Sequence, residues 1–366
     1  MYKRHSLMLT TGFALFSMFF GSGNLIFPII VGKESQGSFI FAALGIILTG
    51  VFVPFLGLLG MNLYKGKLQD FFGILGSKGI LIFSFCSLAL MGPFGVLARC
   101  LVVIHGAIKS IIPVLTLPMV SFAMCVTIFI LCIRPSRIVK AIGVYLTPLL
   151  LLSIFTIAIV GIFNIKEFPV EFSTTSYLSF KNGIIQGYQT MDLLAAFFFS
   201  QFVISQIKES DKDVFFHSSL LGGGLLCIVY LLLVILGWIY NPYLQNANPQ
   251  EMLGIIAQKS IGTHASYLFV ITVVLACLTT AIVLASLFSQ FLFVDMAKQK
   301  IPYSVCLVIT LMIAFFVSTF NFNGIAAFLG PILETIYPLL IAYTLYKILR
   351  SVPFRLKCAQ EKINVR

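Results

Sequence analysis

The sequence predicts an all-α polytopic membrane protein of about ten transmembrane helices, arranged as two halves of five. The chain has 366 residues, of which 59% are hydrophobic and 10% charged, whereas soluble domains carry about 25% charge. Its mean hydropathy is +1.05. The apolar residues form runs of about 20, the length that spans a bilayer as a helix. They lack the alternation typical of a membrane β-barrel.

Each apolar run is predicted to be one span. The expected spans are 6–31, 37–62, 79–107, 117–133, 138–163, 184–207, 215–240, 266–294, 303–320 and 325–349. The first run follows basic residues, as a signal peptide does. It is longer than the apolar region of a signal peptide and further spans follow, so we expect it to be a helix.

Basic residues predict the orientation. With the N-terminus inside, the inner segments hold 18 Lys and Arg and the outer loops hold 5, which leaves Arg99 within a span. Such a bias indicates cytoplasmic termini and a multi-pass protein of the cell inner (plasma) membrane. The net charge of +12 is spread over loops and the C-terminal tail, so it does not predict nucleic-acid binding. The eight cysteines show no metal-binding spacing.

The first span contains a turn sequence, Gly21-Ser22-Gly23-Asn24. Glycine weakens a helix by about 1 kcal/mol relative to alanine, so the helix is expected to unwind there. Pro28 would then fall in the first turn of a restarted helix, where its missing N–H is harmless. Unwound backbone survives at membrane depth only inside protein or beside a cavity. The alternative is close helix packing through the two glycines.

The sixth span reads "NGIIQGYQTMDLLAAFFF" and is also expected to be interrupted. Gly187, Gln189, Thr190 and Asp192 lie together at its middle. A carboxylate there costs about 2.5–3.5 kcal/mol, so it faces a cavity or a partner. The alternative is that Asp192 caps the restarted half-helix.

The two breaks occupy equivalent places in two halves of five spans. Because five is odd, the second half starts from the opposite side of the membrane. This pattern predicts an inverted repeat, with 6–163 as the first unit and 184–349 as the second, within a single transmembrane domain of residues 1–366. Paired interrupted helices in such repeats mark a binding site near the bilayer midplane.

Three segments carry a resemblance to a known family: "FFGSGNLIFP", "GYQTMDLLAA" and "LACLTTA", in this order. They resemble the bacterial branched-chain amino acid:cation symporters, the BrnQ-type carriers of the amino acid/polyamine/organocation superfamily. The resemblance implies a LeuT-type fold and import of leucine, isoleucine and valine with Na⁺ or H⁺ by alternating access. Transport of another neutral amino acid or a nucleobase is the alternative. A channel or a membrane enzyme is less expected. No acid–base pair, metal cluster or nucleotide loop supports an enzyme, and a channel would not show saturable, stereoselective uptake.

An amino acid substrate needs partners for a carboxylate, an ammonium and a side chain. The restarted half of the first span offers N–H groups near Asn24 and Leu25 for the carboxylate. Carbonyl groups from Tyr188 to Thr190 suit the ammonium. The predicted substrate-binding residues are Gly21, Ser22, Gly23, Asn24, Leu25, Tyr188, Gln189, Thr190 and Asp192.

The coupling ion, Na⁺ or H⁺, is the only cofactor expected. The resemblance implies that a sodium ion would contact Ser17, Phe20, Ala276, Thr279 and Thr280. The threonine hydroxyls could instead bond back to the preceding turn. Arg99, Asp192 and Glu334 are gate or proton candidates, although Arg99 could simply reach the outer surface. The expected partners are the amino acid and the lipid bilayer, and the sequence leaves the oligomeric state open.

Overall fold

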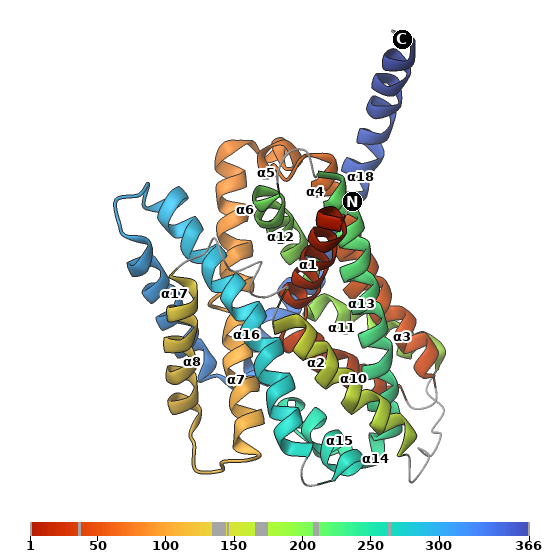
Figure 1. The fold of residues 1–366 in the computed structure, drawn as a ribbon, viewed down its shortest axis with the longest axis vertical. Coiled ribbons are helices and arrows are strands. Elements are labelled where there is room, and N and C mark those ends of the chain that lie inside the picture. The colour runs from red at the N-terminus through yellow and green to blue at the C-terminus, as the bar shows by residue number, and fades with distance from the viewer. Residues whose placement is uncertain are drawn as a thin grey trace.

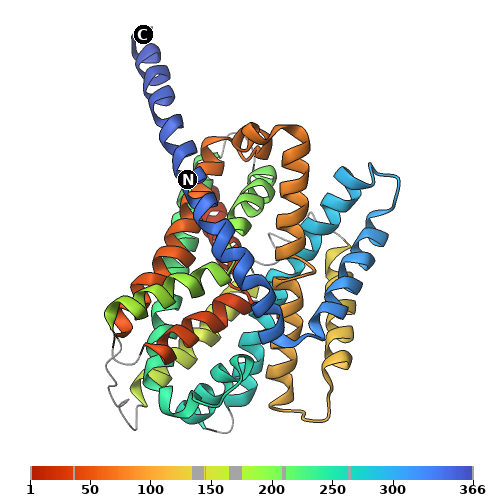
Figure 2. The same ribbon diagram turned by 180° about the vertical axis from the view of Figure 1, so that it is seen from behind.

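The computed structural model describes residues 2–35, 38–133, 144, 146–164, 175–207, 212–262 and 265–364. Within these ranges all regular elements are helices, packed as an elongated bundle (Figure 1). Seen from behind, the last helix leaves the bundle at the end where the chain begins (Figure 2). The all-α prediction is therefore confirmed for the described part of the chain.

The first half of the chain contributes the helices of the first five expected spans. They are α1 (Tyr2–Phe19), α2 (Ser22–Glu34), α3 (Phe39–Ile47), the π-helical turn η1 (Leu48–Phe52), α4 (Val53–Leu63), α5 (Leu68–Phe71), the 3₁₀ turn η2 (Gly73–Leu75), α6 (Gly76–Met91), α7 (Val96–Lys109), α8 (Leu117–Cys132) and α10 (Thr147–Phe163). The start of the fifth expected span, 138–143 and 145, lies outside the described residues.

The second half contributes the remaining helices. They are α11 (Ser176–Gln189), α12 (Asp192–Gln206), α13 (Lys212–Ile239), α14 (Asn241–Leu244), the 3₁₀ turn η6 (Pro249–Glu251), α15 (Met252–Ile261), α16 (Ala265–Phe291), the π-helical turn η7 (Leu292–Met296), α17 (Tyr303–Ser318) and α18 (Asn321–Asn364). Among the described residues, five helical segments are long and apolar enough to cross a membrane, or six if the bent pair α1 and α2 is one span. Three more helices, α8, α10 and α17, are apolar but shorter.

Two packing arrangements hold the interrupted spans. The pair α1 and α2 packs along α13, and the pair α11 and α12 packs along α3 and α4. Glycine permits the closest approach in both. A Cβ at Gly32 of α2 would lie 2.0 Å from the carbonyl oxygen of Val234, and one at Gly45 of α3 would lie 2.3 Å from that of Phe180. Any larger residue would therefore push these helices apart.

The breaks differ in detail from the predictions. The helix restarts at Ser22, because Gly21 already accepts the Leu25 N–H at 3.1 Å. Pro28 therefore lies inside α2 rather than in its first turn, and the prediction for this residue was wrong. Since proline has no N–H, the carbonyl of Asn24, four residues earlier, lacks its helical donor.

Two further differences concern the third and tenth spans. The third span is interrupted between α6 and α7, at Gly92-Pro93-Phe94-Gly95, which we did not predict. The C-terminal helix α18 continues to Asn364, beyond the expected end of the tenth span at 349. Proline and two glycines within four residues are a helix-breaking signal in their own right.

Candidate functional site

The first span is sharply bent at its turn sequence. The helices α1 and α2 meet at 67°. Gly21 forms the N-cap of α2 in an extended conformation, and a Cβ there would lie 2.9 Å from the Thr280 side chain. The N–H groups ahead of Leu25 have no acceptor within the helix. They and the positive end of the helix dipole can therefore receive an anionic group.

The sixth span is interrupted between Gln189 and Asp192. Met191 joins the halves with φ 62° and ψ 19°, a left-handed conformation that a methionine side chain rarely adopts. Thr190 donates through Oγ1 to the Gly187 carbonyl at 2.8 Å, which closes the end of α11. Asp192 stands in the first turn of α12, where the helix dipole favours a carboxylate.

A buried hydrogen-bonded cluster links the two breaks. Asn24 donates through Nδ2 to Asp192 Oδ2 at 2.5 Å and lies 2.6 Å from the Tyr230 hydroxyl. Tyr230 in turn donates to Asp192 Oδ2 at 3.2 Å. The three residues come from α2, α12 and α13, and none is more than 2% exposed. A change in any one of these helices would therefore be felt at the other two.

A small cavity of about 10 Å³, hereafter the central cavity, lies beside this cluster. That is roughly the room of one water molecule. Four of its lining side chains are polar and eight are apolar. The lining residues are Asn24, Thr190, Asp192, Thr280, Met18, Phe19, Met91, Val96, Met191, Ala195, Phe199 and Leu284. Met91 and Val96 flank the break between α6 and α7, so all three interrupted spans reach this cavity.

Oxygen atoms gather where α1 meets α16. The hydroxyls of Thr279 and Thr280 lie 3.2 and 3.1 Å from the carbonyl oxygen of Ser17. Thr279 Oγ1 also lies 2.9 Å from the Leu275 carbonyl and 3.0 Å from that of Ala276. A hydroxyl has one proton for these three carbonyls. The Ser17 Oγ is also buried without a hydrogen-bond partner. Several oxygen atoms in this cluster therefore accept no hydrogen bond and could bind a cation.

Other predicted residues lie nearby. The ring of Phe20 stacks on Phe16 at 5.1 Å, and its backbone closes the last turn of α1. Gly23 faces Thr190, since a Cβ there would lie 3.5 Å from the Thr190 Cα. Tyr188 is half-buried, with its ring 5.1 Å from that of Tyr337.

The two charged gate candidates outside the cluster have different surroundings. Arg99 is fully buried in α7 and donates through Nη2 to the Gln189 carbonyl at 3.1 Å. That carbonyl is one of those expected to receive an ammonium. Glu334 is exposed on α18.

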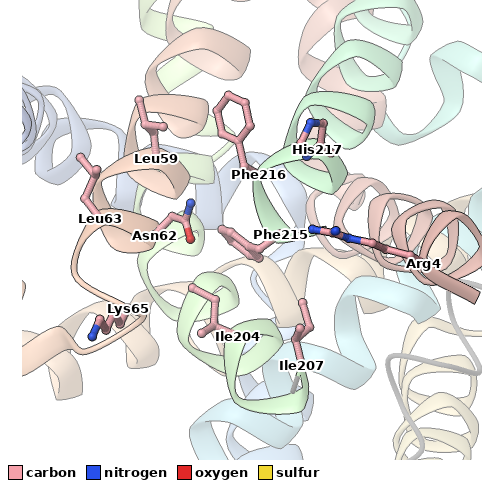
Figure 3. A pocket seen from close by; sticks show the side chains of 10 residues that line it. All are labelled: Arg4, Leu59, Asn62, Leu63, Lys65, Ile204, Ile207, Phe215, Phe216 and His217. Atoms are coloured by element: carbon pink, nitrogen blue, oxygen red, sulfur yellow. The ribbon is translucent and has the colours of Figure 1, made fainter. Parts of the chain in front are cut away.

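A wider cavity of about 540 Å³, hereafter the terminal cavity, lies between the ends of α1, α4, α12 and α13. Figure 3 shows Asn62, Phe215 and Ile204 pointing toward its middle and Arg4 and Lys65 at its sides. The full lining is Arg4, Leu59, Asn62, Leu63, Lys65, Ile204, Ile207, Phe215, Phe216 and His217. It lies at the end of the bundle where the chain begins.

The chain matches the family model described as "Branched-chain amino acid transport protein" over residues 4–363. It belongs to that family. This carrier is 31% identical to a protein of Staphylococcus epidermidis named as a putative branched-chain amino acid carrier, over 91% of this chain and 80% of the relative. It is 29% identical to the branched-chain amino acid permease BrnQ of Corynebacterium glutamicum, over 96% of this chain and 82% of the relative. The carrier is therefore a transport protein and not an enzyme.

Solved structures add the fold. The carrier superposes on a manganese transporter of Eremococcus coleocola with a TM-score of 0.52, at 15% identity, over 96% of this chain and 78% of that one. At this identity the likeness shows a shared fold. Within the described residues of the carrier, no three His, Cys, Asp or Glu side chains gather closely enough to hold a metal ion.

Tyr230 is the site residue that sequence reasoning missed. It lies in the apolar helix α13 and is 0% exposed. A buried tyrosine usually finds a hydrogen-bond partner, so a lone tyrosine in an apolar span was a usable signal. The sequence gives no means of telling that its partners are Asn24 and Asp192, because these lie 206 and 38 residues away.

Proposed function

We propose that this carrier imports leucine, isoleucine and valine across the plasma membrane, in symport with Na⁺ or H⁺. The observation that carries the proposal is the central cavity, where a mainly apolar wall meets two half-helix N-termini and one carboxylate. An aliphatic amino acid needs both kinds of surface. The family and the names of the relatives support the same substrate class.

The substrate's polar groups have partners on opposite sides of this cavity. The free N–H groups at the start of α2 suit the carboxylate. Asp192 suits the ammonium, because it is the one carboxylate among the cavity's lining residues. The cavity holds about one water molecule in this structure, so it would have to widen to admit the substrate, whose side chain would then lie against Met18, Met191 and Leu284. Flexible thioethers fit aliphatic chains of slightly different shape, which agrees with three related substrates.

The packing supports an inverted repeat. In such a repeat the first span corresponds to the sixth, and the second to the seventh. The contact of α1 and α2 with α13 then corresponds to the contact of α11 and α12 with α3 and α4. The contact of α10 with α16 likewise corresponds to that of α18 with α7. The repeat units are 6–163 and 184–349.

We place the coupling cation at the oxygen cluster of α1 and α16. A cation bound to the Ser17 carbonyl and the Thr279 and Thr280 hydroxyls would fix the first break in its binding shape. Phe20 and Ala276 complete the predicted set. If the ion is a proton, Asp192 or Glu334 would carry it. A protonated Asp192, buried beside the substrate site, would bind the ammonium through its neutral carbonyl oxygen rather than by charge.

Alternating access would open this site to each side in turn. The terminal cavity supports a route on the cytoplasmic side, since the distribution of basic residues predicts that the chain starts on that side. Its volume of about 540 Å³ falls in the usual range for small-molecule sites. The substrate would leave between α1, α4, α12 and α13.

Uptake of labelled leucine into proteoliposomes tests the proposal. An inward Na⁺ or H⁺ gradient, with choline as the control cation, should drive accumulation that saturates and that excess isoleucine or valine abolishes. D-Leucine should compete poorly, because the partners of the carboxylate, the ammonium and the side chain are arranged to fit only one enantiomer. Leucine flux that neither saturates nor responds to isoleucine would contradict the carrier proposal and favour a channel.

A further inference from the structure

Arg99 is a buried cation whose guanidinium is only partly hydrogen-bonded in the described part of the chain. It lies one helical turn beyond Val96, which lines the central cavity, and it is 0% exposed. Its Nη2 donates to the neutral Gln189 carbonyl, but Nε and Nη1 have no hydrogen-bond partner. Within the described residues it has no ion pair. Removing a guanidinium from water without such a partner is unfavourable.

Its surroundings do not remove this deficit. The rings of Phe27 and Phe322 lie 5.4 and 5.8 Å from the Arg99 Cζ. Aromatic faces attract a cation but do not accept hydrogen bonds from the edge of the guanidinium plane. Asp192 attracts Arg99 electrostatically, but within the described residues the two side chains form no hydrogen bond or ion pair, and Asp192 Oδ2 accepts from Asn24 and Tyr230. Gln189 Oε1 is also without a partner, but a neutral oxygen cannot balance the charge.

A second donor lies beside this cation. The Tyr337 hydroxyl of α18 is fully buried, and its proton has no acceptor among the described residues. It lies near the backbone N–H groups of Leu193 and Leu194, in the first turn of α12, and interacts electrostatically with Arg99. A guanidinium edge, a phenol O–H and a helix N-terminus all favour a negatively charged ligand.

We propose that Arg99 and Tyr337 bind a small anion, either the carboxylate of the transported amino acid before it reaches the N–H groups of α2, or a free halide such as chloride. The site lies next to the central cavity and is separate from the N–H groups of α2. Arg99 does not line that cavity, and Phe27 and Phe322 enclose it on the side of α2 and α18. If the anion is the substrate carboxylate, the substrate binds here beside the central cavity, and the inference then rests on the proposed function.

The test is binding of leucine and of leucinol, which lacks the carboxylate, to the purified carrier in chloride and in gluconate. If the ligand is the substrate carboxylate, Arg99→Gln should weaken leucine binding about 10- to 100-fold, because a hydrogen bond between charged groups is lost. The affinity for leucinol should change less than about threefold. For a halide, gluconate should weaken leucine binding to the native protein, and Arg99→Gln should abolish that dependence. Lys109→Gln, at the end of the same helix, is the matched control and should leave the affinities for leucine and leucinol unchanged.

Tyr337→Phe keeps the test decisive if Arg99→Gln does not fold. This variant removes only the hydroxyl. It should weaken the binding of leucine relative to leucinol by about 10-fold, as for the loss of one hydrogen bond to a charged group, or reduce the chloride dependence. Equal losses for leucine and leucinol in either variant, with no chloride dependence, would overturn the proposal and leave Arg99 a structural role. Failure of the native protein to take up leucine would instead contradict the proposed function.

Discussion

Asn24 Nδ2 donates to Asp192 Oδ2 over 2.5 Å, although 168 residues separate the two. The bond joins the N-terminus of α2 to that of α12, and Tyr230 secures it from α13. Both interrupted spans are therefore connected at the point where a ligand would enter. An ammonium that binds Asp192 has to share the carboxylate with these two donors, so substrate binding and the relative position of the half-helices are coupled.

The first prediction concerns this carboxylate. Asp192→Asn keeps the shape of the side chain but removes the charge, so leucine binding should fall about 10- to 100-fold. Tyr230→Phe leaves the charge in place and should cost less, about 2- to 10-fold. Equilibrium binding of labelled leucine to the purified variants measures both. A Tyr230→Phe loss larger than that of Asp192→Asn would mean that the carboxylate does not hold the substrate.

The breaks at Gly21 and Asp192 could be predicted because each violates a local rule. Glycines with a serine and an asparagine stand out in an apolar span, and so does a lone carboxylate. The restart point was misplaced, because Gly21 itself serves as the N-cap and brings Ser22 into the helix. The break after Met91 was missed although its glycines and proline were visible in the sequence.

The part of the site that the sequence did not predict depends on contacts between distant segments. Neither the Tyr230 cluster nor the enclosure of Arg99 by Phe27 and Phe322 follows from local patterns, because aromatic residues are expected throughout an apolar span. The apolar lining of the central cavity could not be predicted for the same reason. Methionines and phenylalanines occur in most spans, and only the packing selects those at Met18, Met91 and Met191.

The second prediction concerns the turn sequence. Gly23→Leu should abolish leucine binding while the protein still reaches the membrane, since a Cβ there already lies 3.2 Å from the Phe27 ring and the side chain would fill the space beside Thr190. The matched control is Gly224→Leu in α13, where a Cβ meets no atom within 4 Å. Normal leucine affinity in Gly23→Leu would favour a pure packing role for the glycines.

The third prediction concerns specificity. Leucine, isoleucine and valine differ by a methylene or its placement, worth about 0.8 kcal/mol per group, so one apolar pocket separates them only weakly. The three should compete for uptake. Ala195→Val narrows the central cavity and should reduce leucine and isoleucine uptake more than alanine uptake. If excess isoleucine leaves valine uptake unchanged, the three substrates do not share this pocket.

The last prediction concerns coupling through α16. One positive charge moving down about 100 mV releases about 2.3 kcal/mol, which at about 1.4 kcal/mol per tenfold concentrates a zwitterion roughly 50-fold. This gain requires a cation that stabilises the substrate-binding shape, so each ligand should raise the affinity for the other.

Valine at both Thr279 and Thr280 keeps the side-chain shape and removes both hydroxyls from the Ser17 carbonyl. The double variant should lose cation-stimulated leucine uptake and leucine-stimulated cation binding. Thr272→Val is the control, because that hydroxyl bonds back to Leu268 in its own helix. Unchanged cation dependence in the double variant would move the coupling ion elsewhere, with Asp192 as the next residue to test.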